Sequence, residues 1–316
     1  MSENAINFAA GGAVEPPAPS LPRRRRFGDR KDGWLCKGIS PMAKVSPYIM
    51  KRRSDSQNFI RDTLEINNIE EYIKHKRAEG LKGFGLMHVL IAAYLRALTT
   101  MPRLNRFIAG QRVYARKDIQ VSLVIKREMN TESPDTALKM VFAPDATADD
   151  VYNQITEKVE SYRNDPGGSF DKTAGILNHM PRLVLKFSVW FLKLLDYFGL
   201  LPRTLTDLSP FHGSFFITSM GSLGIPPIYH HLYDFGNVPL FMSFGAKNRR
   251  YELQADGSAR EVKYIDYTFV TDERICDGFY FAASLKAMGR ILRDPFKLDS
   301  RPTEIMIDPD IFPRKS

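Results

Sequence analysis

The segment Thr271 to Gly278, T-D-E-R-I-C-D-G, places a carboxylate between a predicted strand and a predicted helix. Glu273 is the side chain of this segment that could act as a general base. A free glutamate has a pKa about 2 units below that of histidine, so it is the weaker base at neutral pH. Burial against the flanking Phe269, Ile275 and Phe279 could raise the pKa of Glu273. We therefore predict a base that depends on desolvation.

Two adjacent histidines, His230 and His231, lie in the sequence Y-H-H before this segment. Either imidazole could supply the base in place of Glu273. Adjacent histidines are more often ordinary loop residues, so both interpretations stay open. His88 lies in an apolar helical pattern, and we expect it to be a core histidine whose polar atoms are satisfied.

The chain has two cysteines, Cys36 and Cys276, which lie far apart in the sequence. Their spacing matches neither a zinc site nor a disulfide framework. We therefore expect no bound metal and a reducing, cytoplasmic location.

Hydrophobic periodicity predicts the elements that must position these residues. Alternating apolar runs predict strands at Phe59–Ile66, Gln111–Tyr114, Ile119–Lys126, Gly213–Thr218, Pro239–Gly245 and Tyr264–Thr271. Helical spacing predicts helices at Ile69–Arg77, Gly85–Met101, Val151–Tyr162 with a cap at Thr147, and from Phe279 to just before Pro295. We expect the strands at 111–114 and 119–126 to form a hairpin. Strands and helices without regular alternation favour an α+β sandwich over a doubly wound parallel sheet.

The composition is that of a globular protein, because 43% of the 316 residues are hydrophobic and 26% are charged. We predict a flexible tail with a basic run at residues 1–30 and a single domain at residues 31–316. The formal charge of +9 could attract nucleic acid, but no aromatic residues that could stack on bases are interleaved with the basic run. A solvated or internally paired basic arm is the preferred interpretation, and we expect no nucleic-acid partner.

The most apolar stretch of the chain is the segment 180–202. Lys186, Lys193 and Asp196 interrupt it, and charges at the bilayer centre are costly, so a transmembrane helix is not predicted. A buried core helix is the preferred interpretation. A contact between subunits and the lining of a pocket for a long acyl chain are alternatives. A contact with a membrane surface, made together with the basic arm, is a further and less favoured one.

Four ordered motifs resemble those of one protein family. The segment D-E-R-I-C-D-G resembles the H-x-x-x-D-G motif of the dihydrolipoyl acyltransferase catalytic domain, which belongs to the 2-oxo acid dehydrogenase acyltransferases, and of its relative chloramphenicol acetyltransferase. The other three are Pro102–Asn105, Asp118–Val124 and Gly213–Gly224, which are similar to P-x-L-N, to the next strand and to G-T-F-T-I-S-N-L-G-x-x-G. The resemblance covers about residues 40 to 297.

The resemblance implies a chloramphenicol acetyltransferase-like two-layer sandwich with a mixed β-sheet. It also implies a homotrimer with an active site between subunits and a coenzyme A thioester as substrate. Thr218 stands where the family has a hydroxyl that binds the oxyanion of the tetrahedral intermediate, with Ser219 beside it. Asp277 and Gly278 match the end of the motif, and the resemblance implies that the aspartate pairs with a basic residue, for which Lys44, Arg52 and Arg53 are the candidates.

Two departures from the family pattern bear on function. Glu273 stands in place of the catalytic histidine, and it could instead pair with Arg274 or with a neighbouring subunit in a site that no longer catalyses. The sequence also shows no lipoyl domain and no subunit-binding module, so we expect no covalently bound lipoate. We predict an acyltransferase that uses acyl-CoA and may be addressed as Glu273-dependent; a non-catalytic trimeric scaffold is the alternative.

Overall fold

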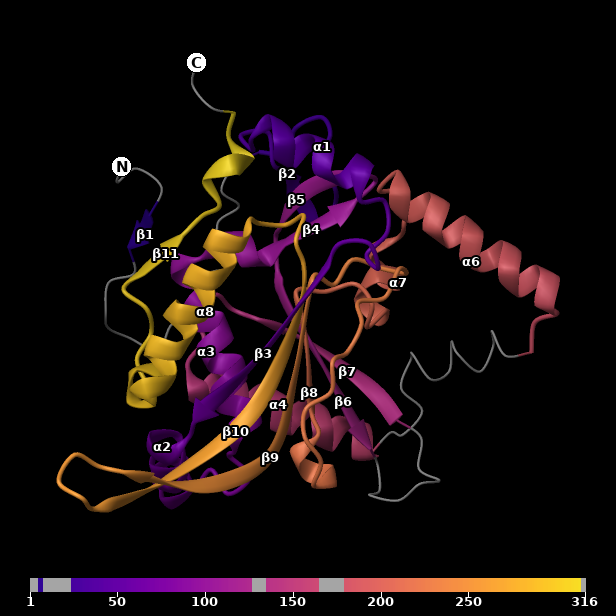
Figure 1. Cartoon of the computed structure of the whole chain (residues 1–316). Coiled ribbons are helices and arrows are strands. Elements are labelled where there is room, and N and C mark those ends of the chain that lie inside the picture. Colours follow the sequence, from indigo (N-terminus) through magenta and orange to yellow (C-terminus); the bar gives the residue numbers. More distant parts are fainter. Residues whose placement is uncertain (1–4, 8–23, 127–134, 165–178, 314–316) are drawn as a thin grey trace.

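The computed structural model describes residues 5–7, 24–126, 135–164 and 179–313. Its centre is a sheet of six strands in the order β3-β10-β9-β8-β6-β7, which Figure 1 shows at the middle of the molecule. The strands are β3 (Gln57–Glu65), β10 (Ala259–Asp272), β9 (Leu240–Leu253), β8 (Phe215–Ser219), β6 (Ile119–Lys126) and β7 (Asp135–Phe142). β8 runs parallel to both β6 and β9, whereas the other pairs are antiparallel, so the sheet is mixed.

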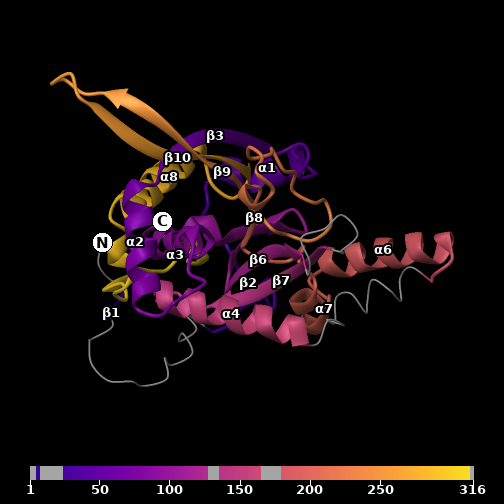
Figure 2. The ribbon, with the colours of Figure 1, turned by 90° about the horizontal axis from the view of Figure 1, so that it is seen from below.

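Helices cover one face of this sheet and form the main core with it (Figure 1, Figure 2). They are α2 (Asn67–Ala78), α3 (Leu86–Thr100), α4 (Ala148–Asn164) and α8 (Gly278–Arg293). The Tyr94 ring of α3 stacks on Phe215 of β8 with centroids 4.3 Å apart, which fixes the helix directly above the central strands. The predicted α+β two-layer sandwich with a mixed sheet is confirmed.

The predicted capping of α4 is also confirmed. The Thr147 hydroxyl accepts a hydrogen bond from the Asp150 backbone N–H at 3.2 Å, and the Asp150 carboxylate accepts one from the Thr147 N–H at 2.9 Å. This reciprocal pair satisfies two of the backbone donors that a helix start leaves unpaired.

A second, smaller sheet has the strand order β2-β5-β4. Its strands are β2 (Gly33–Leu35), β5 (Arg112–Arg116) and β4 (Arg106–Ala109), and the helix α1 (Pro41–Ile49) lies beside it. The predicted hairpin between β5 and β6 is therefore wrong: β5 pairs with β2 and β4, while β6 belongs to the large sheet. The residues between them change sheets, which alternating polarity alone does not reveal.

Segments from the two ends of the chain pair with each other. β1 (Ala5–Asn7) lies antiparallel to β11 (Glu304–Met306), although it falls within the predicted tail. Arg30, at the predicted tail boundary, is buried and forms an ion pair with Asp32. The arm is thus held against the body where the structure describes its last residues.

The apolar segment forms α6 (Arg182–Tyr197), followed by the short helix α7 (Arg203–Leu208). The prediction that α6 is a buried core helix is wrong, because every residue of α6 is exposed or only partly buried. Figures 1 and 2 show α6 projecting from the body in two perpendicular views. Among the helices of the described residues, we find none with the length and apolar character needed to cross a membrane.

Candidate active site

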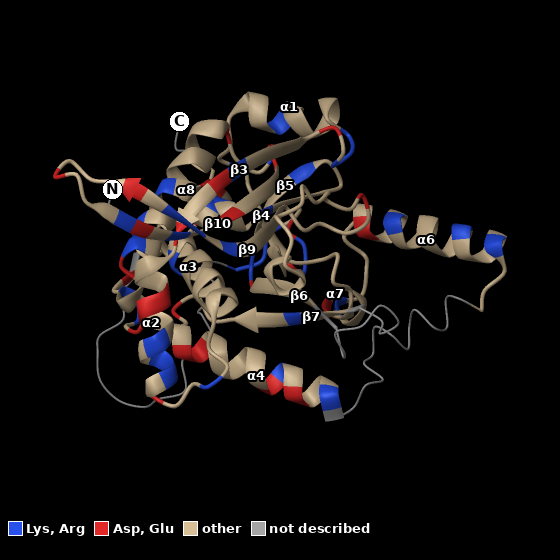
Figure 3. Cartoon of the chain, turned by 60° about the horizontal axis from the view of Figure 1, so that its bottom comes forward, with Lys and Arg blue, Asp and Glu red and all other residues tan. Residues whose placement is uncertain are grey.

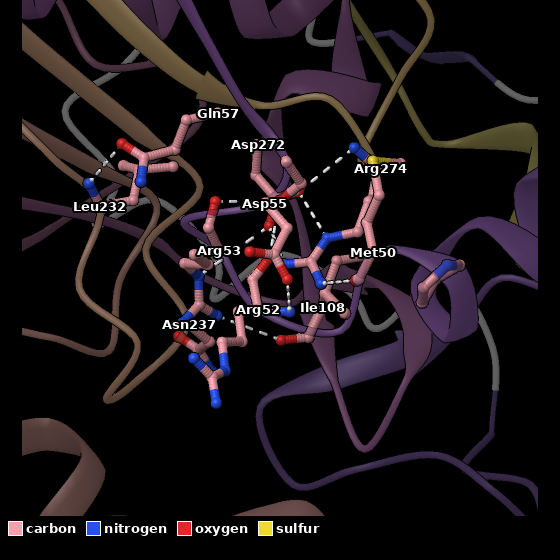
Figure 4. Close-up of polar contacts among 12 residues, drawn as sticks. Met50, Arg52, Arg53, Asp55, Gln57, Ile108, Leu232, Asn237, Asp272 and Arg274 are labelled. Atoms are coloured by element: carbon pink, nitrogen blue, oxygen red, sulfur yellow. Dashed lines mark hydrogen bonds and ion pairs between the residues drawn. The ribbon is translucent and has the colours of Figure 1, made fainter.

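The segment of the predicted base begins at the last residue of β10. Asp272 is buried, and its backbone N–H donates to the Pro239 carbonyl at 2.9 Å. Its carboxylate accepts two hydrogen bonds from the Arg274 guanidinium, at 2.7 and 2.6 Å, and one from the Ser56 hydroxyl at 3.1 Å (Figure 4). Such a two-fold contact between guanidinium and carboxylate fixes both groups in geometry as well as energy.

Arg53 lies on the other side of the same carboxylate. Its Nε is 3.9 Å from an Asp272 oxygen, and its remaining nitrogens donate to the Tyr233 and Ile108 carbonyls. Burial lowers the pKa of Arg53, and the positive charge of Arg274 lowers it further against the opposing effect of Asp272. Two buried guanidinium groups thus share one buried carboxylate, as Figure 4 shows.

Glu273 points away from this buried group. Its backbone N–H donates to the Ser56 carbonyl at 2.9 Å, whereas its side chain is exposed. The side chain lines a cavity of about 500 Å³ together with residues of α1, Arg103 and Cys276. The burial that a strong carboxylate base requires is therefore not supplied by the chain itself.

The predicted partner of Asp277 differs from the observed one. Asp277 is exposed and caps α8, because its carboxylate accepts a hydrogen bond from the Tyr280 backbone N–H at 2.8 Å. Of the predicted basic partners, Arg53 does reach the motif, but it faces Asp272 rather than Asp277. Gly278 begins the helix with open space where a Cβ would lie, so packing within the chain does not require glycine there.

A second buried ion cluster forms the wall of the same cavity, and the sequence analysis missed it. Arg106 donates to Asp308 at 2.5 and 2.7 Å and to Asp310 at 2.6 Å. Its neighbour Arg103 lies 3.2 Å from Asp310. Burial opposes the charge of Arg106, yet its hydrogen bonds and ion pair with Asp308 hold its pKa above the ordinary value. The signal in the sequence was the pair of acids in D-P-D, but nothing in the sequence tied it to the P-R-L-N-R segment.

Cys276 is the thiol of this cavity. Burial raises its pKa to about 12. The side chain is therefore a neutral thiol at physiological pH, and it lacks the thiolate character of a nucleophilic cysteine.

Thr218 lies near the end of β8, on the face of the sheet opposite the helices. It pairs with Ser243 of β9, and Phe216 pairs with Phe241 on the same face. Thr218 is buried and Ser219 is partly buried.

The structure does not bring Thr218 and Glu273 together within one chain. Thr218 lies level with Ser243, whereas Thr271 lies level with Leu240, and Glu273 continues in the same direction beyond it. At about 3.3 Å per residue along a strand, the Thr218 and Glu273 backbones are about 15 Å apart. That distance is far beyond hydrogen-bond reach, so each chain carries two separate half-sites.

His230 lies much closer to Thr218. Its ring stacks on Phe241 with centroids 3.8 Å apart, and burial lowers its pKa. Its Nδ1 accepts a hydrogen bond from the His231 backbone N–H at 3.0 Å, so the neutral ring carries its proton on Nε2. In that tautomer Nε2 is a hydrogen-bond donor and not a base. The His231 side chain is exposed.

Another cavity, of about 440 Å³, adjoins the first across Arg274. Its lining includes the cations Lys51, Arg52, Arg53 and Lys193. Among the residues that the structure describes, we find no group of three His, Cys, Asp or Glu side chains that could hold a metal ion.

The fold is that of dihydrolipoamide acetyltransferase catalytic cores. The structure is similar to the dihydrolipoamide acetyltransferase of Azotobacter vinelandii, with a TM-score of 0.54 and 12% identity over 82% of this chain and 93% of that one. It is similar to a probable dihydrolipoamide acetyltransferase of Listeria monocytogenes 4b F2365, with a TM-score of 0.52 and 17% identity over 85% and 96%.

A third similar structure is the truncated catalytic core of the 2-oxoacid dehydrogenase multienzyme complex of Thermoplasma acidophilum, with a TM-score of 0.51 and 13% identity over 81% of this chain and 97% of that one. The Azotobacter vinelandii study concerns a serine, a histidine and an asparagine in the catalytic mechanism of that enzyme. No protein-family model matches the sequence. No curated protein matches it either.

Proposed function

We propose that the protein is a coenzyme A-dependent acyltransferase whose active site is completed between two copies of the chain. The observation that carries this proposal is the separation of Thr218 and Glu273 by about 15 Å, estimated from the strand register, in a fold otherwise like that of acetyltransferase cores. A homotrimer, as the family resemblance implies, would place the Glu273 of one subunit opposite the Thr218 of the next.

In the proposed reaction, an acceptor thiol, alcohol or amine attacks the carbonyl carbon of the acyl-CoA thioester while Glu273 accepts its proton. The Thr218 hydroxyl of the neighbouring subunit donates a hydrogen bond to the oxyanion of the tetrahedral intermediate. Collapse of the intermediate breaks the carbon–sulfur bond, and the protonated Glu273 returns the proton to the leaving coenzyme A sulfur. The neighbouring subunit must also exclude water from Glu273, because the side chain is exposed in the single chain.

The remaining parts of this proposal follow from the same chemistry. The substrate is an acyl-CoA thioester, and no covalently bound lipoate is involved. A cytoplasmic location suits free thiols such as Cys36 and Cys276.

A non-catalytic scaffold with the same fold is the second candidate. The exposure of Glu273 favours it, because an ionised carboxylate beside a developing oxyanion would repel it by about 4 kcal/mol at 4 Å and an effective dielectric of 20. A scaffold would assemble and could bind coenzyme A without turnover.

The test measures release of free coenzyme A from a panel of acyl-CoA thioesters with thiol, alcohol and amine acceptors. Under the proposal, Glu273→Gln and Thr218→Val each lower turnover by at least about tenfold, because each removes a group that acts in the transition state. Glu71→Gln, an exposed glutamate on α2, is the matched control and should retain full activity. Equal rates for wild type and Glu273→Gln would remove Glu273 from any role as base.

Mixing the two variants tests the shared site directly. When Glu273→Gln and Thr218→Val subunits are unfolded together in equal amounts and refolded, random assembly restores about one quarter of the sites, because each restored site takes Glu273 from one subunit and Thr218 from another. Mixtures of correctly assembled but inactive protein would show that the two residues do not share a site. Absence of turnover by the wild type across the panel would favour the scaffold.

A further inference from the structure

The outer surface of α6 is broadly apolar. Leu183 is 79% exposed, Phe187 59% and Trp190 55%, and further apolar side chains lie between and beyond them. The surface continues past the end of the helix to Phe198 and Leu200, which are also exposed. Contiguous exposed apolar surface of this kind marks an interaction site.

The polar side of α6 is narrow and carries cations. Arg182, Lys186 and Lys193 fall on one stripe, because they are spaced at four and seven residues. The acidic residue of the helix, Asp196, is at its attached end, where it forms an ion pair with Arg30. Figure 3 shows the blue bands of the cations along α6 and the red band at the end nearest the body.

The attachment of α6 is firm. The Arg30 guanidinium donates to the Asp196 carboxylate at 2.5 Å, and the Tyr197 hydroxyl donates to the Gln111 side chain at 2.9 Å. The backbone at Gly110 approaches the Tyr197 carbonyl so closely that a Cβ there would lie 2.3 Å from the carbonyl oxygen, and Gly110 has a positive φ. The helix is therefore presented away from the body in a fixed direction.

We infer that α6 binds the surface of an anionic lipid bilayer, with its apolar face among the acyl chains near the headgroups and its axis parallel to the membrane. A helix of 16 residues is about 24 Å long, which is shorter than the roughly 30 Å hydrocarbon core, so it lies on the bilayer rather than across it. Tryptophan, phenylalanine and leucine on one side with lysine and arginine on the other are typical of such helices.

The distribution of side chains favours lipid over a second copy of the chain. A helix that packs on another helix uses a narrow apolar seam, whereas the apolar side chains of α6 cover more than half of its circumference. Protein burial of this surface would also have to match Lys186 and Arg182 with acids, but a lipid surface accommodates them because long basic side chains extend to the phosphate groups. A second copy is therefore an outcome of the test and not the proposal.

The first experiment is co-sedimentation of the full chain with vesicles. We expect binding to vesicles of phosphatidylglycerol and phosphatidylcholine, weaker binding to phosphatidylcholine alone, and at least about tenfold weaker binding of the double variant Phe187→Asp with Phe191→Asp. The matched control is Tyr251→Asp with Leu253→Asp, two exposed apolar residues of the β9 strand, which should bind like wild type.

The second experiment uses the two tryptophans of the chain. Trp34 is 3% exposed and Trp190 is 55% exposed, so lipid carrying brominated acyl chains should quench mainly Trp190. Trp190→Phe should abolish this quenching. The inference is overturned if wild type does not bind anionic vesicles, if Trp190 is not quenched, or if the Phe187 and Phe191 substitutions change the oligomeric state while vesicle binding persists. These outcomes are independent of acyltransferase activity.

Discussion

The group formed by Asp272, Arg274 and Arg53 gives a sharp stability prediction. In Asp272→Asn, two buried guanidinium groups lose the carboxylate between them while the side-chain volume is almost unchanged. Unit charges about 4 Å apart attract by about 4 kcal/mol at an effective dielectric of 20. Breaking a buried ion pair on one side costs about 3 to 5 kcal/mol, since the remaining charge stays buried. We expect the free energy of unfolding of Asp272→Asn to fall by that amount.

The second substitution should partly rescue the first. Arg274→Met alone leaves Asp272 with Arg53 and Ser56, so its cost should be smaller than that of Asp272→Asn. In the double variant the surplus cation is gone, so the loss of stability should be smaller than the sum of the two single losses by at least about 1 kcal/mol. This coupling distinguishes uncompensated charge from a general loss of packing.

The assay is urea unfolding followed by circular dichroism at one fixed protein concentration, because assembly of subunits adds to the apparent stability. Arg61→Gln, which removes the exposed ion pair of Arg61 with Asp266, is the control and should change the unfolding midpoint little. Strictly additive losses in the double variant, or a cost of Asp272→Asn no larger than that of the surface control, would refute the reasoning.

Three further predictions concern titratable groups. Burial alone would raise the pKa of Asp196, but its hydrogen bond with His212 and the charge of Arg30 lower it to about 2, so its stabilisation of about 2 kcal/mol is complete above pH 4 and is lost as the pH falls toward 2. Urea unfolding of Asp196→Asn should show a lower free energy at pH 7 and a flatter acid dependence; an unchanged acid limb would contradict this. Burial lowers the pKa of Lys139 to about 7, so folding releases a proton and the free energy of unfolding should rise by up to about 1.4 kcal/mol per pH unit above pH 7; Lys139→Met should flatten that rise, and an equal slope in both proteins would count against it. Because burial raises the pKa of Cys276 to about 12, the native protein should react slowly with Ellman's reagent at pH 8 and quickly once unfolded; rapid labelling of the native state would disprove the assignment.

Elements with strong local signals were predictable from the sequence. The apolar run of α3 and the capping box of Thr147 and Asp150 each follow from local physics, and both are present in the structure. His88 was expected to be a satisfied core histidine, and its Nδ1 accepts a hydrogen bond from the Gly85 N–H at 3.0 Å. α1 was missed, because its proline-containing pattern at Pro41–Ile49 resembles an extended arm.

What failed depended on contacts between distant segments. The apolar pattern of α6 is the same whether a core, a partner or a lipid surface covers it, so the sequence could not reveal its exposure. The contact of Arg106 with Asp308 joins residues 202 positions apart, which no local pattern encodes. Arg53 was among the expected partners of the motif, but only the structure shows that Asp272, and not Asp277, accepts it.

The surroundings of Glu273 separate where the residue is held from what it can do. Its backbone is fixed by the Ser56 carbonyl on one side and by the buried contact of Asp272 with Arg274 on the other, so its position is set within the chain. Its side chain, in contrast, faces an open cavity lined by Arg103. An exposed carboxylate beside a cation is a weak base, whereas the same carboxylate covered by an apolar neighbour is a stronger one. The reactivity of Glu273 therefore depends on the surface that a neighbouring subunit places over this cavity.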